Sequence, residues 1–332
     1  MPLLDTRLRL TPSEYPFAED YFHKVLATHW THTEVSMAPD KMAWQNLPER
    51  DKEAIAGLLQ GFTMLEAHVA CYWSDVVAKH CGAPEIVAMA RQFSAQETVH
   101  AYAYNHLEAS LGLDTYEAFL QNSEAQAKLK HFAPHSVMDE WDGSSLDICK
   151  LIDALAFFSG CGEGVSLFAS FAILLSYDKA GAGLLGLSQI LSWSTRDENM
   201  HSDAAAELFK IASQEYDYKP EQYKVANWFE LTVQNELAFI APAFAKGDLP
   251  GISYAEAEAF TKARANDRIV LLGYKPIYEE AEIKLSANVA EWFYPKVQGT
   301  TLHDFFSRKH NGSAYSAKAG TGLASTDITG LF

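Results

Sequence analysis

The sequence contains one unusual pattern twice: a lone glutamate inside a long apolar stretch, followed by a Glu-x-x-His unit. Glu66 lies 31 residues before the unit that begins at Glu97, and Glu163 lies 35 residues before the unit that begins at Glu198. On a helix, residues three apart share a face, so each unit can direct a carboxylate and an imidazole at one point. Because an ionised carboxylate facing an apolar core is costly unless it is paired or bound to metal, the fold must collect these groups.

Six side chains from this pattern form a candidate site for two metal ions. In ferritin-like bundles, a glutamate from each of two helices and a Glu-x-x-His from each of the other two point inward. Mixed oxygen and nitrogen ligands suit iron or manganese, and the lack of thiolates argues against structural zinc. The predicted metal ligands are Glu66, Glu97, His100, Glu163, Glu198 and His201. The alternative is that both lone glutamates lie at the surface on misassigned helices and that the two motifs are coincidental.

Helices are predicted for most of the chain. Only 19 of the 332 residues are glycine and 12 are proline, and the prolines lie at the edges of long stretches with apolar residues every three or four positions. Ser253 and Glu256 have the spacing of a capping box at a helix start. No segment shows the alternation typical of a strand. We therefore predict an all-α, ferritin-like bundle with helices near residues 17–30, 48–80, 84–111, 145–177, 183–213, 219–245 and 254–282.

Composition excludes several other classes of protein. The apolar content of 48% supports a large buried core, and the net charge of −17 would repel a phosphate backbone, so no nucleic-acid partner is expected. No uninterrupted apolar run approaches the roughly 18 residues of a membrane span, and the N-terminus lacks the apolar block of a signal peptide. The four cysteines form no CxxC pair. We expect a soluble protein of a reducing compartment, located in the cytoplasm.

The last residues differ from the rest of the chain. Residues 307–332 are small and polar, rich in Gly, Ser and Thr, and lack a helical period. This composition predicts a flexible C-terminal tail after a folded domain of residues 1–306. The tail carries Tyr315 and ends in Leu331 and Phe332, which suits a peptide that docks on a partner, although a terminus without a role is the commoner case.

Four segments make the chain resemble the radical-generating small subunit of class I ribonucleotide reductase. HWTHTEV surrounds Trp30, FSAQETVHAYAY contains a tyrosine four residues after His100, STRDENMH contains Asp197 before its Glu-x-x-His, and TTLHDFFSR precedes the tail. The resemblance extends from about Tyr21 to Tyr315. It implies a ferritin-like bundle whose six predicted ligands hold a dinuclear metal centre.

The resemblance also implies a mechanism and partners. The metal centre reacts with oxygen and generates a tyrosyl radical, and the oxidising equivalent passes to a separate large subunit that reduces ribonucleotides. The residues implied on this route are Tyr104, His100, Asp197, Trp30 and Tyr315. The expected partners are the large subunit, bound through the tail, a second copy of the chain, and a flavoprotein activator used by some members.

Metal identity and function class leave alternatives open. The family uses two iron ions, one manganese and one iron ion, or two manganese ions. Glu66 stands where the best-known tyrosyl-radical di-iron members have aspartate, and glutamate there recurs in members that use manganese. A ferritin-like dimetal oxidase or monooxygenase acting on a small apolar substrate would use the same six ligands, without needing Tyr104, Trp30, Asp197 or the tail. A ferritin-like storage protein would be shorter and would form a cage.

Two physical expectations accompany these roles. Asp197 is adjacent to Glu198 and so points to a different helix face, where it can accept a hydrogen bond from the His100 ring nitrogen that faces away from the metal. A water-free shell around the radical is expected from Phe158, Leu167, Phe168 and Phe171. Taken singly, Trp30 and Tyr104 are better explained by ordinary core packing, and only their combination with the metal motif favours a redox role.

Overall fold

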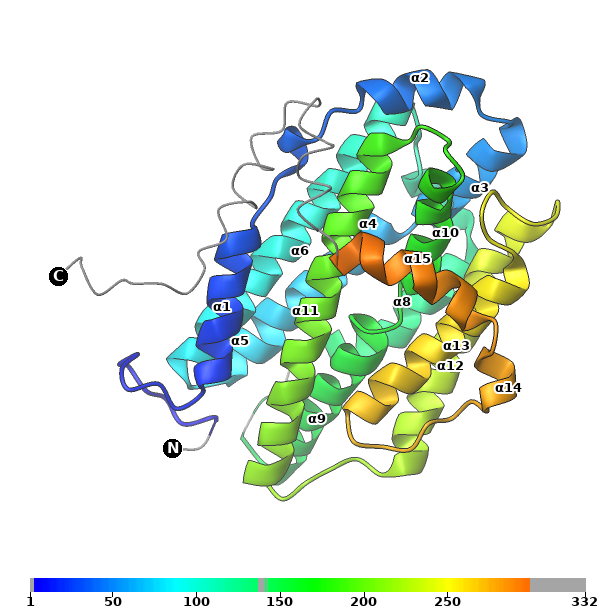
Figure 1. Ribbon diagram of the computed structural model, residues 1–332. Coiled ribbons are helices and arrows are strands. Elements are labelled where there is room, and N and C mark those ends of the chain that lie inside the picture. The colour runs from blue at the N-terminus through cyan, green and yellow to red at the C-terminus, as the bar shows by residue number, and fades with distance from the viewer. Residues whose placement is uncertain (1–2, 137–140, 142, 299–332) are drawn as a thin grey trace.

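The computed structural model describes residues 3–136, 141 and 143–298, and these residues are mostly helical (Figure 1). Isolated pairing of Leu249 with Ile252 is the only β-type contact in the described part of the chain. The α-helices are α1 Pro16–Thr28, α2 Ala38–Asn46, α3 Glu49–Leu59, α4 Phe62–Cys71, α5 Ala78–His80, α6 Pro84–Leu111, α7 Tyr116–Gln121, α8 Ser123–Ser136, α9 Ser145–Phe157, α10 Phe168–Lys179, α11 Leu185–Glu215, α12 Gln222–Ile240, α13 Tyr254–Leu271, α14 Glu280–Ile283 and α15 Ser286–Gln298. Two short 3₁₀ helices are η1 His32–Glu34 and η4 Ala241–Phe244, and two π-helical turns are η2 Tyr72–Val77 and η3 Phe158–Gly162. The predicted all-α class is confirmed.

Four neighbouring helical segments form the centre of the bundle. The long helices α6 and α11 lie side by side, α4 packs against α6, and α9 with η3 packs against α11 (Figure 1). Helix α1 lies against α6 at one side of the molecule, and α12 and α13 lie at the other side. The segments that carry the six predicted ligands are therefore neighbours in the core.

Local sequence signals explain where some helices begin and end. Helix α6 covers residues 84–111, as predicted, because Pro84 suits a first helical turn and Gly112, with a φ of 72°, adopts the left-handed conformation that ends it. Helix α13 begins with the predicted capping box. There Ser253 Oγ accepts a hydrogen bond from the Glu256 amide, and the Glu256 carboxylate accepts one from the Ser253 amide at 2.9 Å.

Two predicted helices are interrupted, and each interruption lies near a predicted ligand. The stretch 48–80 bends at Gly61, where a φ of 86° separates α3 from α4, and it then contains η2. The stretch 145–177 changes to a π-helix in η3 and unwinds over residues 163–167, where Leu167 has a φ of 73°. Helices buried on all sides show no apolar stripe whose phase could reveal a break. Such π-turns often occur at functional sites.

Other predicted boundaries are wrong for local reasons. Helices α2, α7, α8 and α15 lie outside the predicted ranges, partly because Pro134 and Pro295 occur inside α8 and α15 and break up the proline-free stretches. The predicted helix 254–282 is too long. Helix α13 ends at Leu271 because Gly273 adopts a φ of 79° and Pro276 follows.

The helical stretch Glu49–His80 is unusually apolar. Within Glu49–His80, a window of 18 residues is apolar enough to cross a membrane, the single such case among the described residues. Half of that window is buried inside the bundle. The stretch also contains the buried Glu66. This stretch behaves as a core element of the fold.

Two further predictions concern cysteines and the tail. All four cysteines are free, as expected from the absence of a disulfide framework. The predicted tail, with Tyr315, Leu331 and Phe332, and the predicted domain boundary after residue 306 lie outside the described residues.

Candidate metal centre

The six predicted ligands come together in the centre of the bundle, and all six are buried. They are Glu66 on α4, Glu97 and His100 on α6, Glu163 in the segment that follows η3, and Glu198 and His201 on α11. Four separate limbs of the chain thus contribute to one cluster.

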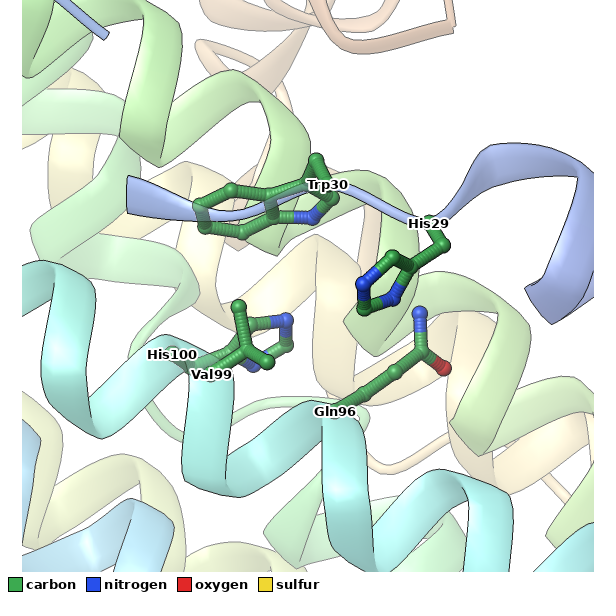
Figure 2. A pocket seen from close by; sticks show the side chains of 5 residues that line it. All are labelled: His29, Trp30, Gln96, Val99 and His100. Carbon is green, nitrogen blue, oxygen red and sulfur yellow. The ribbon is translucent and has the colours of Figure 1, made fainter. Parts of the chain in front are cut away.

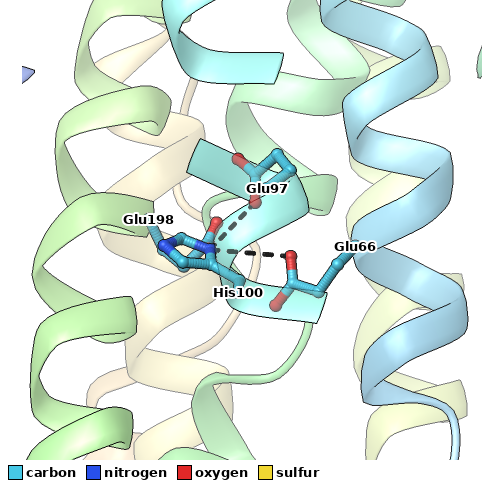
Figure 3. A group of neighbouring side chains, drawn as sticks. All are labelled: Glu66, Glu97, His100 and Glu198. Atoms are coloured by element: carbon cyan, nitrogen blue, oxygen red, sulfur yellow. Dashed lines mark hydrogen bonds and ion pairs between the residues drawn. The ribbon is translucent and has the colours of Figure 1, made fainter. Parts of the chain in front are cut away.

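The ligand atoms form two overlapping groups, each with its atoms within 4.8 Å of one another. The first group contains Glu66, Glu97, His100 and Glu198 (Figure 3), and the second contains Glu97, Glu163, Glu198 and His201. Glu97 and Glu198 belong to both groups. These two carboxylates could therefore each contact both ions of a metal pair.

Several buried polar atoms of the cluster have no hydrogen-bond partner among the described residues. They are Glu66 Oε1, Glu97 Oε1, Glu163 Oε2, Glu198 Oε1 and His201 Nδ1. Leaving so many polar atoms unsatisfied in a core is costly. Because cations among these atoms would satisfy them together, the residues fit a dinuclear metal group.

His100 is the imidazole of the first group, and Figure 3 shows three carboxylates around it. Its Nδ1 atom lies 3.0 Å from Glu97 Oε2, 3.0 Å from Glu198 Oε1 and 3.9 Å from Glu66 Oε2. One cation among these atoms could therefore contact side chains from α4, α6 and α11.

His201 is the imidazole of the second group. Its Nδ1 atom lies 2.5 Å from Glu97 Oε1 and 3.4 Å from Glu163 Oε2, yet it completes no hydrogen bond. Both histidines of the Glu-x-x-His units thus turn Nδ1 toward the shared carboxylates.

Without cations, the four carboxylates of this cluster are too close together to be ionised at the same time. Burial raises the pKa of Glu66, and burial together with the neighbouring carboxylates raises the pKa of Glu198 well above its ordinary value. Burial also acts to raise the pKa of Glu97, but the imidazoles of His201 and His100 outweigh burial and lower it. For both imidazoles, burial is in turn outweighed by Glu97, so the pKa of His201 rises to about 10. The metal-free cluster therefore holds protons that bound metal ions must displace.

The residue before each Glu-x-x-His unit contacts the histidine of the other unit. Asp197 Oδ2 lies 3.3 Å from His100 Nε2, which is the predicted contact. Gln96 Oε1 lies 2.9 Å from His201 Nε2. Each contact engages Nε2 of a ring, so that Nδ1 faces the shared carboxylates, where a metal could bind it. Sequence reasoning missed Gln96, although its position matches that of Asp197 in the other unit.

Trp73 is another residue that sequence reasoning missed. It lies in η2, and its Nε1 donates a hydrogen bond of 2.5 Å to Glu163 Oε1. The indole packs edge-on against Phe93, with ring centroids 4.8 Å apart. One oxygen of Glu163 is thereby held, and the unpartnered Oε2 faces the cluster.

Trp30 contacts two of the residues implied on the radical route, Asp197 and His100, and Figure 2 shows it beside His100. Its Nε1 donates a hydrogen bond to Asp197 Oδ2 at 2.7 Å, and its ring stacks on His100 with 5.7 Å between centroids. Burial acts to raise the pKa of Asp197, but Arg196, 2.8 Å from Oδ1, outweighs burial and lowers it. An ionised Asp197 therefore joins the indole to the imidazole.

A narrow pocket lies beside this chain of contacts, lined by His29, Trp30, Gln96, Val99 and His100. Figure 2 shows the His29 ring and the Gln96 amide facing each other across it. The Gln96 side-chain oxygen contacts His201. Its amide nitrogen has no hydrogen-bond partner among the described residues.

Tyr104 lies one helical turn after His100 and is fully buried. Phe62 packs edge-on against its ring with centroids 4.9 Å apart, and Phe171 packs on Phe62 in turn. Ser194 lies near the Tyr104 hydroxyl without completing a hydrogen bond to it. Burial, followed by the charge of Glu66, raises the pKa of the phenol well above 10, so Tyr104 is neutral at physiological pH.

The expected water-free shell is buried as a whole. Phe158, Leu167, Phe168 and Phe171 are all excluded from solvent. Phe171 is linked to Tyr104 through Phe62, and Phe168 packs edge-on against Phe171 with centroids 5.8 Å apart. Phe158 instead stacks on Tyr72 with centroids 4.0 Å apart. Tyr315, the last residue of the implied route, lies outside the described residues.

Comparisons with known proteins agree on one family. The family model "Ribonucleotide reductase, small chain" matches residues 7–285. A probable ribonucleoside-diphosphate reductase small subunit, 048L, of Invertebrate iridescent virus 3 is 27% identical over 334 residues, covering 96% of this chain and 87% of the relative. The ribonucleoside-diphosphate reductase subunit beta of Chlamydia pneumoniae is 25% identical over 316 residues, with coverage of 91% and 88%.

Solved structures share the fold. The ribonucleotide reductase R2 subunit from Clostridium botulinum aligns with a TM-score of 0.79 and 16% identity, covering 90% of this chain and 94% of that chain. The dimanganese(II)-NrdF of Streptococcus sanguinis aligns with a TM-score of 0.69 and 19% identity, with coverage of 86% and 99%.

Proposed function

Because this chain belongs to the small-chain family of ribonucleotide reductase, we propose that it is the radical-generating small subunit of a ribonucleoside-diphosphate reductase. The observation that carries the proposal is the buried cluster of four carboxylates and two imidazoles, with unpartnered atoms directed at one another. When bound, a dinuclear centre of iron, manganese or both activates oxygen and supplies the oxidising equivalent. The structurally similar Streptococcus sanguinis protein is a dimanganese(II)-NrdF.

The residues divide naturally between two metal ions. Glu97 and Glu198 would contact both ions, because each belongs to both groups of ligand atoms. The terminal ligands would be Glu66 and His100 for one ion and Glu163 and His201 for the other. The four carboxylates then balance two divalent cations.

Tyr104 is the proposed site of the stored radical. Its phenol is protonated in the resting protein, so removing an electron from it also releases the hydroxyl proton. Phe62 covers the ring, and Phe171 extends that apolar layer. Excluding water in this way protects an oxidised tyrosine from reduction by solutes.

Trp30, Asp197 and His100 are the proposed route from the metal cluster toward the protein surface. The support is their unbroken series of contacts, with Asp197 accepting the indole N–H and lying next to His100 Nε2. Arg196 keeps Asp197 charged, so its Oδ2 can hold the Trp30 proton in place. Tyr315 would continue the route toward the large subunit.

The proposal includes the partners of the protein. A small subunit of this reductase implies a large-subunit partner, and we propose that this partner holds the ribonucleotide substrate. We place the contact with that subunit in residues 307–332 and propose a homodimer in the cytoplasm, with a flavoprotein activator if the metals are manganese. Nucleic acid is not among the proposed partners, consistent with the net charge of −17.

A dimetal oxidase or monooxygenase remains the alternative function. Such an enzyme would use the same six ligands on a small apolar substrate. It would not need an indole hydrogen-bonded to the carboxylate that contacts a ligand histidine, as Trp30 is bonded to Asp197. That series of contacts favours the reductase subunit.

Deleting residues after Gly312 is expected to reduce ribonucleotide turnover with the large subunit to background. The physical reason is the loss of the apolar side chains of the tail, among them Leu331 and Phe332, together with Tyr315. Metal content and any organic radical signal should stay at the level of the full chain. The measurement is turnover with the large subunit from the same source, beside metal analysis and paramagnetic resonance.

A free peptide of residues 313–332 should inhibit the full-length protein, and a scrambled peptide should not. Full activity of the truncated protein would reject the docking role of the tail. A full-length, metal-loaded protein that supports no turnover with the large subunit would instead favour the oxidase alternative.

A further inference from the structure

A buried arginine on α13, Arg264, contacts the residues that follow two of the predicted ligands. Arg264 Nε donates a hydrogen bond of 2.6 Å to the Gly164 carbonyl, and Gly164 follows Glu163. The terminal Nη2 donates a hydrogen bond of 2.6 Å to Asn199 Oδ1, and Asn199 follows Glu198. One guanidinium thus connects the segment that carries Glu163 with helix α11, which carries Glu198.

The Gly164 carbonyl is available because the helix breaks there. In a continuous helix it would accept the amide of Phe168, but that amide bonds to the Val165 carbonyl at 3.1 Å. A buried carbonyl without a partner is costly, and Arg264 supplies the missing donor. The side chain therefore stabilises the unwound segment that sets the direction of Glu163.

Steric fit also fixes this segment. A Cβ atom added at Gly164 would lie 2.3 Å from the Gly160 carbonyl oxygen, so the chain is closely packed at the break. The guanidinium carbon of Arg264 lies 3.8 Å from the ring centroid of Phe168, the first residue of α10. Arg264 therefore contacts both ends of the interruption between η3 and α10.

The contact with α11 is equally well defined. Asn199 donates its own side-chain N–H to the Thr195 carbonyl at 3.0 Å, which orients its amide and points Oδ1 at Arg264. Arg264 itself is 2% exposed and forms no ion pair with a carboxylate in the described part of the chain. Burial lowers the pKa of its guanidinium to about 10, so it is charged at neutral pH. This buried cation donates to one neutral acceptor on each of the two segments that carry Glu163 and Glu198, which indicates a positioning task.

We propose that Arg264 is a positioning residue for the metal ion bound by Glu163, Glu198 and His201. By tying Gly164 to Asn199, it holds the Glu163 carboxylate against α11 in the arrangement that this ion requires. The ion bound by Glu66 and His100 shares Glu198 but takes no ligand from the unwound segment at Gly164, so we expect it to keep its affinity. The inference rests on the proposed ligand set.

The test is titration of the full-length protein with Mn(II), followed by calorimetry and by the paramagnetic resonance of bound Mn(II). The wild-type protein should bind two ions and show the spectrum of a coupled pair. Arg264→Met, which keeps the apolar stem, should bind one ion with unchanged affinity and the other at least about 10-fold more weakly, giving a single-ion spectrum at low metal concentration. Arg264→Lys should show an intermediate loss, because one ammonium cannot reproduce the planar fork.

Arg268→Met is the matched control on the same helix. Arg268 lies one turn further along α13 and bonds to Ser202 Oγ and Asp203 Oδ1. The methionine keeps the Cγ atom that packs beside Gly164, and the bonds from Arg264 to Gly164 and Asn199 stay in place. Arg268→Met should bind two ions as the wild type does. If Arg264→Met does not fold, Arg264→Lys and Asn199→Ala decide the question by the same site-selective loss.

Three outcomes distinguish the claims. Site-selective weakening in the Arg264 variants supports the positioning role. Two ions bound with wild-type affinity in folded Arg264→Met, or equal weakening of both ions, would overturn it. A wild-type protein that fails to bind two ions would instead overturn the proposed ligand set.

Discussion

Tyr104→Phe is expected to keep both metal ions and to lose the sharp organic radical signal and the turnover that depends on it. The tyrosine is buried against Phe62, so removing one hydroxyl changes the packing little. Phenylalanine is much harder to oxidise and has no acidic proton to release. Metal analysis and paramagnetic resonance after aerobic loading with iron and with manganese would measure the effect.

Tyr72→Phe is a matched control for that experiment. Tyr72 is also fully buried and, like Tyr104, carries a hydroxyl without a completed hydrogen bond among the described residues. Its ring stacks on Phe158, whereas that of Tyr104 packs against Phe62. We expect Tyr72→Phe to retain the signal. A radical that survives Tyr104→Phe and disappears with Tyr72→Phe would reassign it.

Glu97→Gln is expected to have the largest effect on metal content. Glu97 contributes to both groups of ligand atoms, and an amide supplies one neutral oxygen where a carboxylate supplies two charged ones. The loss of affinity for at least one ion should exceed the roughly 10- to 100-fold typical of residues that only support a ligand. Radical formation should be lost with the pair. Metal stoichiometry after equilibrium dialysis measures the change.

Glu108→Gln is the control on the same helix. Glu108 is a largely buried carboxyl eleven residues further along α6, and burial raises its pKa to about 7. Making it neutral is therefore a small change for the folded state. This variant should bind two ions as the wild type does. Equal metal content in Glu97→Gln and wild type would show that Glu97 is not a ligand.

Much of the fold could be predicted because helical periodicity and caps act locally. Helix α6 has the predicted bounds, since Pro84 and Gly112 mark both ends in the sequence itself. The break over residues 163–167 could not be predicted, because its stabilising donor, Arg264, lies 100 residues away along the chain. Helix α8 was hidden by Pro134, which lies within it.

In the site, too, spacing within one helix could be predicted from the sequence, whereas contacts between helices could not. Spacing alone placed Glu97 and His100 on one helix face, and the structure places Glu66, Glu163 and the second Glu-x-x-His unit around them. Contacts across helices were harder to foresee. Trp73 reaches Glu163 from a π-helical turn, and Gln96 reaches His201 from the neighbouring helix, so neither is marked by its own motif.

The most direct test is anomalous diffraction from crystals of the full-length protein loaded with Mn(II) or Fe(II), recorded at the absorption edge of the metal. We expect two peaks per chain, one among Glu66, Glu97, His100 and Glu198 and the other among Glu97, Glu163, Glu198 and His201. A single peak, or peaks outside this cluster in a fully loaded crystal, would contradict it.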